Sequence, residues 1–233
     1  MIDFKRQLDL LNIIGKELKR KIEVLIIGGS AMMFLGAKTE TKDIDLVLLN
    51  KNDFILIKEI LEKIGFRKRA LKITRGNYQA RFSPIFLEMG DIRFDLFLKE
   101  VICIKITKSI LERVREVHEF ENLIIKVLSP EDLILMKSTT ERAGDREDGR
   151  TLIEKYKIDW DIVLEESLRQ TEIGASVFPV FLYDFLVELK EDLKVDIPKE
   201  VILKIMKIAE RAFLKKKTSE KKKKGKLIKE EKY

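Results

Sequence analysis

Residues 23–49 have the sequence EVLIIGGSAMMFLGAKTETKDIDLVLL, and the architecture follows from the elements that this stretch predicts. The short apolar run over 23–27 stops at two adjacent glycines, Gly28 and Gly29, which predicts a buried strand that enters a tight turn. A second apolar run over 44–49 predicts the next strand, and the apolar segment between the two runs has the length of a two-turn helix. Strand, glycine turn, short helix and strand in this order indicate an α/β arrangement.

Three aspartates are placed where strands bring side chains together. Residues two apart on a strand point to the same side, so Asp43 and Asp45 project together. Asp95 alternates with apolar residues in the predicted strand 92–98 and leaves it on the polar face. Converging carboxylates repel each other unless a divalent cation neutralises them. The pattern predicts a site for one or two Mg²⁺ or Mn²⁺ ions that hold a triphosphate.

The glycine turn is suited to the phosphates of such a ligand. Gly28 and Gly29 let the backbone come close to a phosphate, and Ser30 adds a hydroxyl and N–H groups at a helix start. Each element also has a purely structural interpretation. Gly-Gly turns often join a strand to a helix, and Asp-x-Asp pairs often lie in solvated turns. The conjunction of the elements at this spacing favours the nucleotide site.

Taken together, these residues resemble the nucleotidyltransferase superfamily related to polymerase beta. Gly-Gly-Ser at 28–30 is followed about thirteen residues later by Asp-x-Asp at 43–45, and Asp95 stands on a later strand. The resemblance implies an α+β fold, in which a minimal mixed sheet is flanked by helices and followed by a helical C-terminal half and a basic tail. It also implies transfer of NMP from an NTP to an acceptor hydroxyl, with release of pyrophosphate.

The same resemblance gives the candidate residues their roles. Asp43 and Asp45 would hold the metal ions, and Asp95 would share one ion and help to deprotonate the acceptor hydroxyl. The residues expected to bind the nucleotide in this turn are Gly28, Gly29 and Ser30.

The helical half looks like the AbiEii-type abortive-infection toxins and their uncharacterised prokaryotic relatives. The match rests on Lys137 and on Asp145-Arg146-Glu147-Asp148, and it implies that Lys137 and Asp148 bind the nucleotide. It further implies a toxin-like enzyme whose acceptor is an RNA end such as tRNA, and an antitoxin protein as partner. A protein side chain is the second candidate acceptor, and a small molecule, as in antibiotic adenylyltransferases, is the third.

Structural alternatives stand beside this second match. Lys137 also fits a surface lysine with a buried stem, and Asp145 also fits the cap of a helix. The chain departs from the family pattern where relatives carry an Arg, since Thr39 occupies that position between Lys38 and Lys42. Whether a guanidinium contact to the nucleotide is absent, or is replaced by a lysine, is left open.

The net charge of +7 belongs to the C-terminal tail. Residues 215–233 contain ten Lys and three Glu, which also gives +7, so residues 1–214 sum to zero. We predict three parts: a nucleotidyltransferase domain over 1–128, a helical domain over 129–214 and a mobile basic tail. Such a tail fits an RNA partner, or serves solubility alone.

The remaining composition excludes several classes of protein. A single cysteine, Cys103, excludes an internal disulfide, and a single histidine, His118, leaves no partner for a Cys/His zinc site. Charges interrupt every apolar run, so no membrane span is expected. Asp3 stands where a signal peptide needs cations followed by an apolar block, so no signal peptide is expected, and we predict a cytoplasmic protein. Many Lys, Glu and Ile with few Gln are typical of proteins from hot environments.

A hairpin is predicted over 86–98, because Gly90-Asp91 is a two-residue turn signal between two strand patterns. The basic segment between the second predicted strand and this hairpin contains Lys72, Arg75 and Arg81. By resemblance one of these cations is expected to meet the substrate, and a solvated strand face is the alternative. The rival to an enzyme is a non-catalytic binding module, with a vestigial site and a tail that tethers nucleic acid or a protein.

Overall fold

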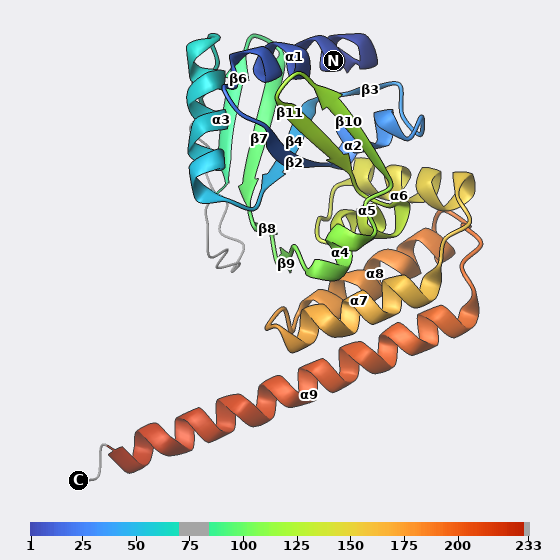
Figure 1. Ribbon diagram of the computed structural model, residues 1–233. Helices are drawn as coiled ribbons and strands as arrows, with labels where there is room; N and C mark the ends of the chain where they lie inside the picture. Colours follow the sequence, from blue (N-terminus) through green and yellow to red (C-terminus); the bar gives the residue numbers. More distant parts are fainter. Residues whose placement is uncertain (70–83, 231–233) are drawn as a thin grey trace.

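The computed structural model describes the backbone of residues 1–69 and 84–230, and the side chains of these ranges as far as residue 214 (Figure 1). A seven-stranded mixed sheet has the order β10-β11-β2-β4-β7-β6-β5, which confirms the expected α+β class with a mixed sheet flanked by helices. Its strands are β2 (Ile22–Ile27), β4 (Asp43–Leu48), β5 (Arg67–Lys68), β6 (Ile85–Met89), β7 (Ile92–Leu98), β10 (Glu116–Phe120) and β11 (Leu123–Val127).

The central strand β4 alternates between core and site as its sequence predicts. Ile44, Leu46 and Leu48 are fully buried, whereas Asp43 and Asp45 lie on the other face and are partly exposed. Strand β7 alternates in the same way and pairs with β4 in parallel. Both strands therefore present their acidic residues on one face of the sheet.

Helices cover the sheet and hold its central strands in place. Helices α1 (Phe4–Glu17) and α3 (Lys51–Lys63) pack against strands, and α2 (Gly28–Phe34) contacts both β2 and β4 (Figure 1). The caps are polar residues: the Asp3 carboxylate accepts from the Arg6 N–H, and the backbone N–H of Asn52 donates to the Asn50 side chain.

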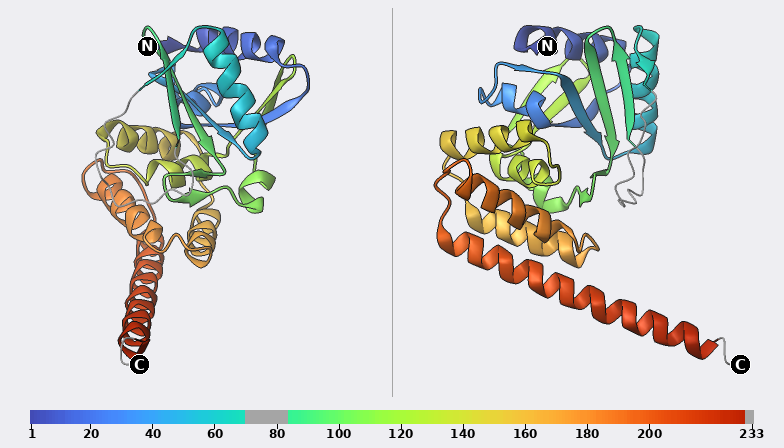
Figure 2. Two further views of the ribbon diagram at one scale, coloured as in Figure 1. Left: turned by 90° about the vertical axis from the view of Figure 1, so that its left-hand side faces the viewer. Right: turned by 180° about the vertical axis from the view of Figure 1, so that it is seen from behind.

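The second half of the chain is helical, as predicted, and its helices gather at one end of the sheet (Figures 1 and 2). Ser129 caps the first of the large helices, whose first residue is Pro130, in the pattern that the sequence predicts. The helices after the sheet's central strands are α4 (Lys108–Glu112), α5 (Pro130–Lys137), α6 (Ala143–Lys155), α7 (Trp160–Glu172), α8 (Phe178–Glu191) and α9 (Lys199–Glu230). No helix within residues 1–69 and 84–230 has an apolar stretch that could cross a bilayer.

One continuous hydrophobic core joins the two halves. It includes Phe94 of the sheet and Phe178 and Phe185 of α8, all fully buried. The boundaries at residues 128 and 214 therefore stay predictions, as does the mobility of the tail. In the structure α9 continues as far as Glu230, and its C-terminal part extends away from the other helices (Figure 2).

Several short strands were not expected. The sequence predicts a helix that starts at Thr107 or Ser109 and runs to about Arg115, but α4 ends at Glu112 and β10 follows. Strand β10 forms because Val117 and its neighbours pair antiparallel with β11 across the turn at Glu121, which has a left-handed φ of 54°. The small pairs outside the main sheet are β1 (Ile2–Asp3) with β3 (Glu40–Thr41), and β8 (Glu100–Val101) with β9 (Ile104–Lys105).

Candidate active site

The register of the central strands brings the three predicted aspartates to one place. Asp45 of β4 is the direct partner of Asp95 of β7, and it is also the partner of Ile27 at the end of β2. Asp43 lies two residues before Asp45 on the same face. Sequence alternation places each side chain on a face, and strand pairing sets the three on neighbouring positions of that face.

Asp43 has a cationic neighbour that sequence analysis missed. Arg93 Nε lies 2.5 Å from Asp43 Oδ1, and Arg93 is the direct strand partner of Asp43. The same oxygen is buried, and within the part of the chain that the structure describes it accepts no well-aligned hydrogen bond, from Arg93 or from any other group. Arg93 stands two residues before Asp95, so the alternation of β7 is a signal that could have placed it on the site face.

Burial and mutual repulsion raise the pKa values of two of the carboxyl groups. The pKa of Asp45 is raised to about 8, first by burial and then by the charges of Asp95 and Asp43, while Lys137 and Arg142 oppose the shift. The pKa of Asp95 is raised to about 6 by burial and by Asp43. Ionising the whole group without a cation therefore costs free energy. The influence of Lys137 and Arg142 also shows that the helical half faces the site.

The glycine turn packs tightly against the aspartates. Gly28 has a left-handed φ of 63°, and a Cβ at this residue would lie 2.3 Å from Asp45 Oδ2. A Cβ at Gly29 would lie 2.5 Å from Thr41 Oγ1. Gly28 is thus favoured by its backbone conformation, and the missing side chains of both glycines allow close packing on Asp45 and Thr41, whatever ligand the turn holds. A bulky residue at Gly29 would disturb the packing on Thr41, so loss of nucleotide binding in such a variant would not by itself identify a phosphate cradle.

The side chain of Ser30 has partners inside the protein. It is fully buried, and its hydroxyl donates to the Ile27 carbonyl (2.8 Å) and accepts from the Asp45 N–H (3.2 Å). The hydroxyl therefore ties the turn to the strand that carries the aspartates. Binding of phosphate by the turn stays a prediction for its backbone.

A change at Ser30 tests this positioning role. We expect Ser30→Ala to cost about 1–2 kcal/mol of unfolding free energy, because the Asp45 N–H loses its buried partner. Transfer should slow through kcat, with the KM for NTP nearly unchanged, since the hydroxyl holds Asp45 and not the nucleotide. Steady-state kinetics and a urea titration measure both effects. A higher KM with an unchanged kcat would show that the hydroxyl binds phosphate instead.

The helical half contributes a buried group of charges. Lys137 Nζ lies 2.6 Å from Asp145 Oδ1 and 2.5 Å from Asp148 Oδ2. Asp145 also accepts hydrogen bonds from the Thr140 hydroxyl and from Arg142 Nε. Burial acts to lower the pKa of Lys137, but Asp145 and Asp148 outweigh it and raise that pKa. Lys137 is therefore a fully charged lysine inside the protein.

The structure decides between the alternatives for Lys137 and Asp145. Lys137 is only 8% exposed, so it is not a surface lysine. Helix α6 has Arg142 as its N-cap and no capping side chain, so the expectation that Asp145 caps this helix is wrong. Asp145 lies in the first turn and pairs with Lys137 instead. The roles of Lys137 and Asp148 toward a nucleotide stay predictions.

The three aspartates have the right chemistry for a divalent cation. All their donors are carboxylate oxygens, which Mg²⁺ and Mn²⁺ prefer. The raised pKa values of Asp45 and Asp95 are features that a cation would relieve. In the described residues no three acidic, His or Cys side chains already converge as a ligand set.

Other expected residues lie elsewhere. Lys72, Arg75 and Arg81 fall within 70–83, outside the described residues. Burial raises the pKa of the Cys103 thiol to about 12. His118 Nε2 lies 2.9 Å from Glu116 Oε2, and its ring packs on Phe34, with 4.7 Å between the centroids.

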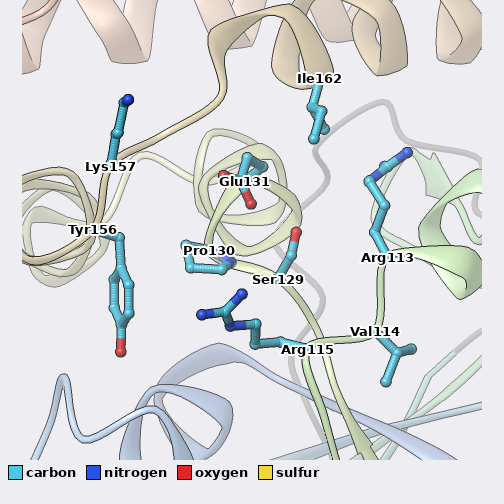
Figure 3. A pocket seen from close by; sticks show the side chains of 9 residues that line it. All are labelled: Arg113, Val114, Arg115, Ser129, Pro130, Glu131, Tyr156, Lys157 and Ile162. Carbon is cyan, nitrogen blue, oxygen red and sulfur yellow. The ribbon is translucent and has the colours of Figure 1, made fainter.

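A separate pocket lies between the residues before β10, the start of α5 and the connection from α6 to α7. Its volume is about 470 Å³, and none of the three aspartates lines it. Figure 3 shows Arg115 and Tyr156 among its side chains, and the Tyr156 hydroxyl donates to the Leu35 carbonyl. The pocket therefore borders the loop after α2, and it is distinct from the aspartate site.

The comparison with solved structures gives distant matches only among those cited here. JHP933 from Helicobacter pylori is 15% identical, with a TM-score of 0.39 over 97% of this chain and 100% of its own. An antigenic nucleotidyltransferase-like protein from Paracoccidioides brasiliensis is 15% identical, with a TM-score of 0.46 over 86% of this chain and 98% of its own. ANT(2")-Ia, solved with adenylyl-2"-tobramycin, is 17% identical, with a TM-score of 0.43 over 78% and 98%. No curated protein matches the sequence.

The family comparison is more decisive than these distant likenesses. A family model described as "Nucleotidyltransferase of unknown function (DUF6036)" matches residues 5–194. The match includes the glycine turn, the three aspartates and the buried charges of α5 and α6. The chain therefore belongs to this family of nucleotidyltransferases.

Proposed function

We propose that this protein is a metal-dependent enzyme that transfers NMP from an NTP to an acceptor hydroxyl. The observation that supports it most is the register of β4 and β7, which sets Asp45 opposite Asp95 beside Asp43. Mg²⁺ or Mn²⁺ bound by Asp43, Asp45 and Asp95 would supply positive charge to the triphosphate and its leaving group. The turn at Gly28, Gly29 and Ser30 would hold the phosphates through its backbone. Lys137 and Asp148 of the helical half would also bind the nucleotide.

The proposed reaction forms one bond and breaks another. The acceptor oxygen bonds to the α-phosphorus, and the bond from that phosphorus to the bridging oxygen breaks, so that pyrophosphate leaves with the electron pair. Asp95 takes the proton of the acceptor hydroxyl. A carboxylate beside the reacting atoms is suited to the role of general base.

The acceptor is proposed from the resemblance to toxin-type enzymes. An RNA end such as tRNA comes first, and a protein hydroxyl or a small molecule are the alternatives that the experiment separates. The test incubates the protein with Mg²⁺, each of the four NTPs labelled at the α-phosphate, and separate RNA, protein and metabolite fractions. We expect label in the RNA fraction. Label in another fraction would correct the acceptor, and an antitoxin would be sought only if the RNA product is found.

The basic tail offers a second test of an RNA acceptor. We expect truncation after Leu214 to lower RNA affinity and to flatten its salt dependence, because each Lys on a phosphate contributes about −0.7 to the log–log slope on single strands. NTP binding should stay unchanged, since the nucleotide residues lie in the body. Filter binding across a salt series compares the two proteins. Identical curves would reject tethering by the tail, as residues 1–214 have no net charge.

The rival to this proposal is a protein that has kept the nucleotidyltransferase fold and lost the activity. A non-catalytic module with a vestigial site would show little metal-dependent NTP binding. Thermal melts with and without Mg²⁺ and NTP distinguish the two, because a ligand that binds the folded state raises the melting temperature.

A further inference from the structure

Lys38 connects the two halves of the protein at the glycine turn. Its Nζ lies 2.6 Å from Asp148 Oδ1, between residues 110 positions apart in the sequence. Its stem crosses the turn, since Lys38 Cδ would lie 3.6 Å from a Cβ at Gly29. Lys38 therefore lies between the proposed phosphate cradle and the charges of α6.

Asp148 is shared by two lysines that differ in how free they are to move. Lys38 contacts one carboxylate oxygen, and Lys137 contacts the other. The Lys38 side chain is 31% exposed, and its only described ion pair is this one. The Lys137 side chain is 9% exposed and holds Asp145 as well.

The two lysines therefore differ in the cost of leaving Asp148. If Lys38 turns away, Asp148 keeps the charge of Lys137, and no buried carboxylate is stranded. If Lys137 left, Asp145 would lose its main buried cation, and an uncompensated buried charge is expensive. Of the two, Lys38 is the cation that can be exchanged.

We propose that Lys38 is a phosphate-binding residue of the nucleotide site, which rests on Asp148 in the free protein and transfers to the β- or γ-phosphate when an NTP binds. This inference rests on the proposed function and deepens it. A lysine ammonium is a compact charge with three rotatable donors, which suits phosphate oxygens. The flanking Thr39 and Lys42 are exposed, whereas Lys38 already faces the turn.

The alternative is a purely structural role, in which Lys38 only links the sheet half of the chain to the helical half. The chain offers a matched control for that role, because Lys155 also ties the loop after α2 to α6. Its Nζ donates to the Gly36 carbonyl, and its side chain has no contact with the aspartates or with Asp148 among the contacts that the structure describes. Lys155→Gln removes a tie of the same kind without removing the proposed phosphate ligand.

The test measures binding of all four NTPs, and of the matching NDP and NMP, by calorimetry with Mg²⁺. The proteins are the full-length wild type, Lys38→Gln, Lys38→Met, Lys38→Arg and Lys155→Gln, each first checked by a thermal melt. We expect both neutral Lys38 variants to lose about tenfold or more in NTP affinity, as the loss of one charged hydrogen bond implies, and to lose most of the preference for NTP over NMP. Lys38→Arg should keep part of the affinity, and Lys155→Gln all of it.

The outcomes separate the inference from the function on which it rests. If the wild type binds no NTP, the proposed function fails, and the inference fails with it. If the wild type binds NTP and the neutral Lys38 variants bind it equally well, the inference alone is overturned. It is overturned in the same way if Lys38→Gln and Lys155→Gln lower the melting temperature alike and leave the preference for NTP unchanged.

Discussion

Asp45→Asn is expected to abolish transfer and at the same time to stabilise the free protein. The rate of transfer should fall at least about a thousandfold, since the variant removes a ligand of the metal ion that would stabilise the charge of the transition state. The gain in unfolding free energy without divalent ions should be on the order of 2 kcal/mol, or roughly 5 °C in melting temperature. The physical reason is that burial, Asp95 and Asp43 all disfavour the charged form of Asp45.

A carboxylate outside the site provides the control for this prediction. Asp91 lies in the turn between β6 and β7, and its side chain is 59% exposed. Asp91→Asn should leave both transfer and melting temperature nearly unchanged. Thermal melts with and without Mg²⁺ and NTP complete the comparison. If Asp45→Asn were stabilised by these ligands as much as the wild type is, Asp45 would not belong to the metal site.

Lys137→Ala is expected to destabilise the protein by about 3 kcal/mol, the cost of leaving buried carboxylates without their partner. Helix propensity alone predicts the opposite, because Ala is a better helix former than Lys. Tertiary contacts decide the sign here: Lys137 is buried between Asp145 and Asp148. Urea unfolding of the wild type and the variant measures the difference.

The control for Lys137 is a lysine in a pair near the surface. Lys58 Nζ lies 2.8 Å from Glu62 Oε2 on α3, and both side chains are partly exposed. Such a pair is worth about 0.3–0.5 kcal/mol, so Lys58→Ala should have a small effect. Equal losses in the two variants would contradict a central electrostatic role for Lys137.

Much of the site was predictable because it depends on local pattern. Alternation along β4 fixes the faces of Asp43 and Asp45, and the same rule places Asp95. The glycine turn follows from two adjacent glycines at the end of an apolar run. The resemblance to nucleotidyltransferases that these elements carry is confirmed by the family match, while the finer likeness to AbiEii-type toxins stays a prediction.

Pairing between residues far apart in the chain could not be predicted from the sequence. No local rule links Lys38 to Asp148, which are 110 residues apart. Helix α5 is buried from Leu133 to Lys137, so it has no polar face to separate a buried lysine from an exposed one. The hydroxyl of Ser30 was likewise expected to meet a ligand. Its internal partners, Ile27 and Asp45, could not be recognised from the sequence, because they come together only when β2 and β4 pair.

The proposed reaction is tested by following transfer from an NTP labelled at the α-phosphate, in parallel with the same NTP labelled at the γ-phosphate. We predict that α-label becomes covalently joined to an acceptor, that pyrophosphate appears in equal amount, and that Asp95→Asn abolishes both. The γ-label should leave with pyrophosphate. The proposal would be contradicted if the folded wild type bound NTP with Mg²⁺ or Mn²⁺ and transferred no α-label to RNA, protein or metabolite fractions.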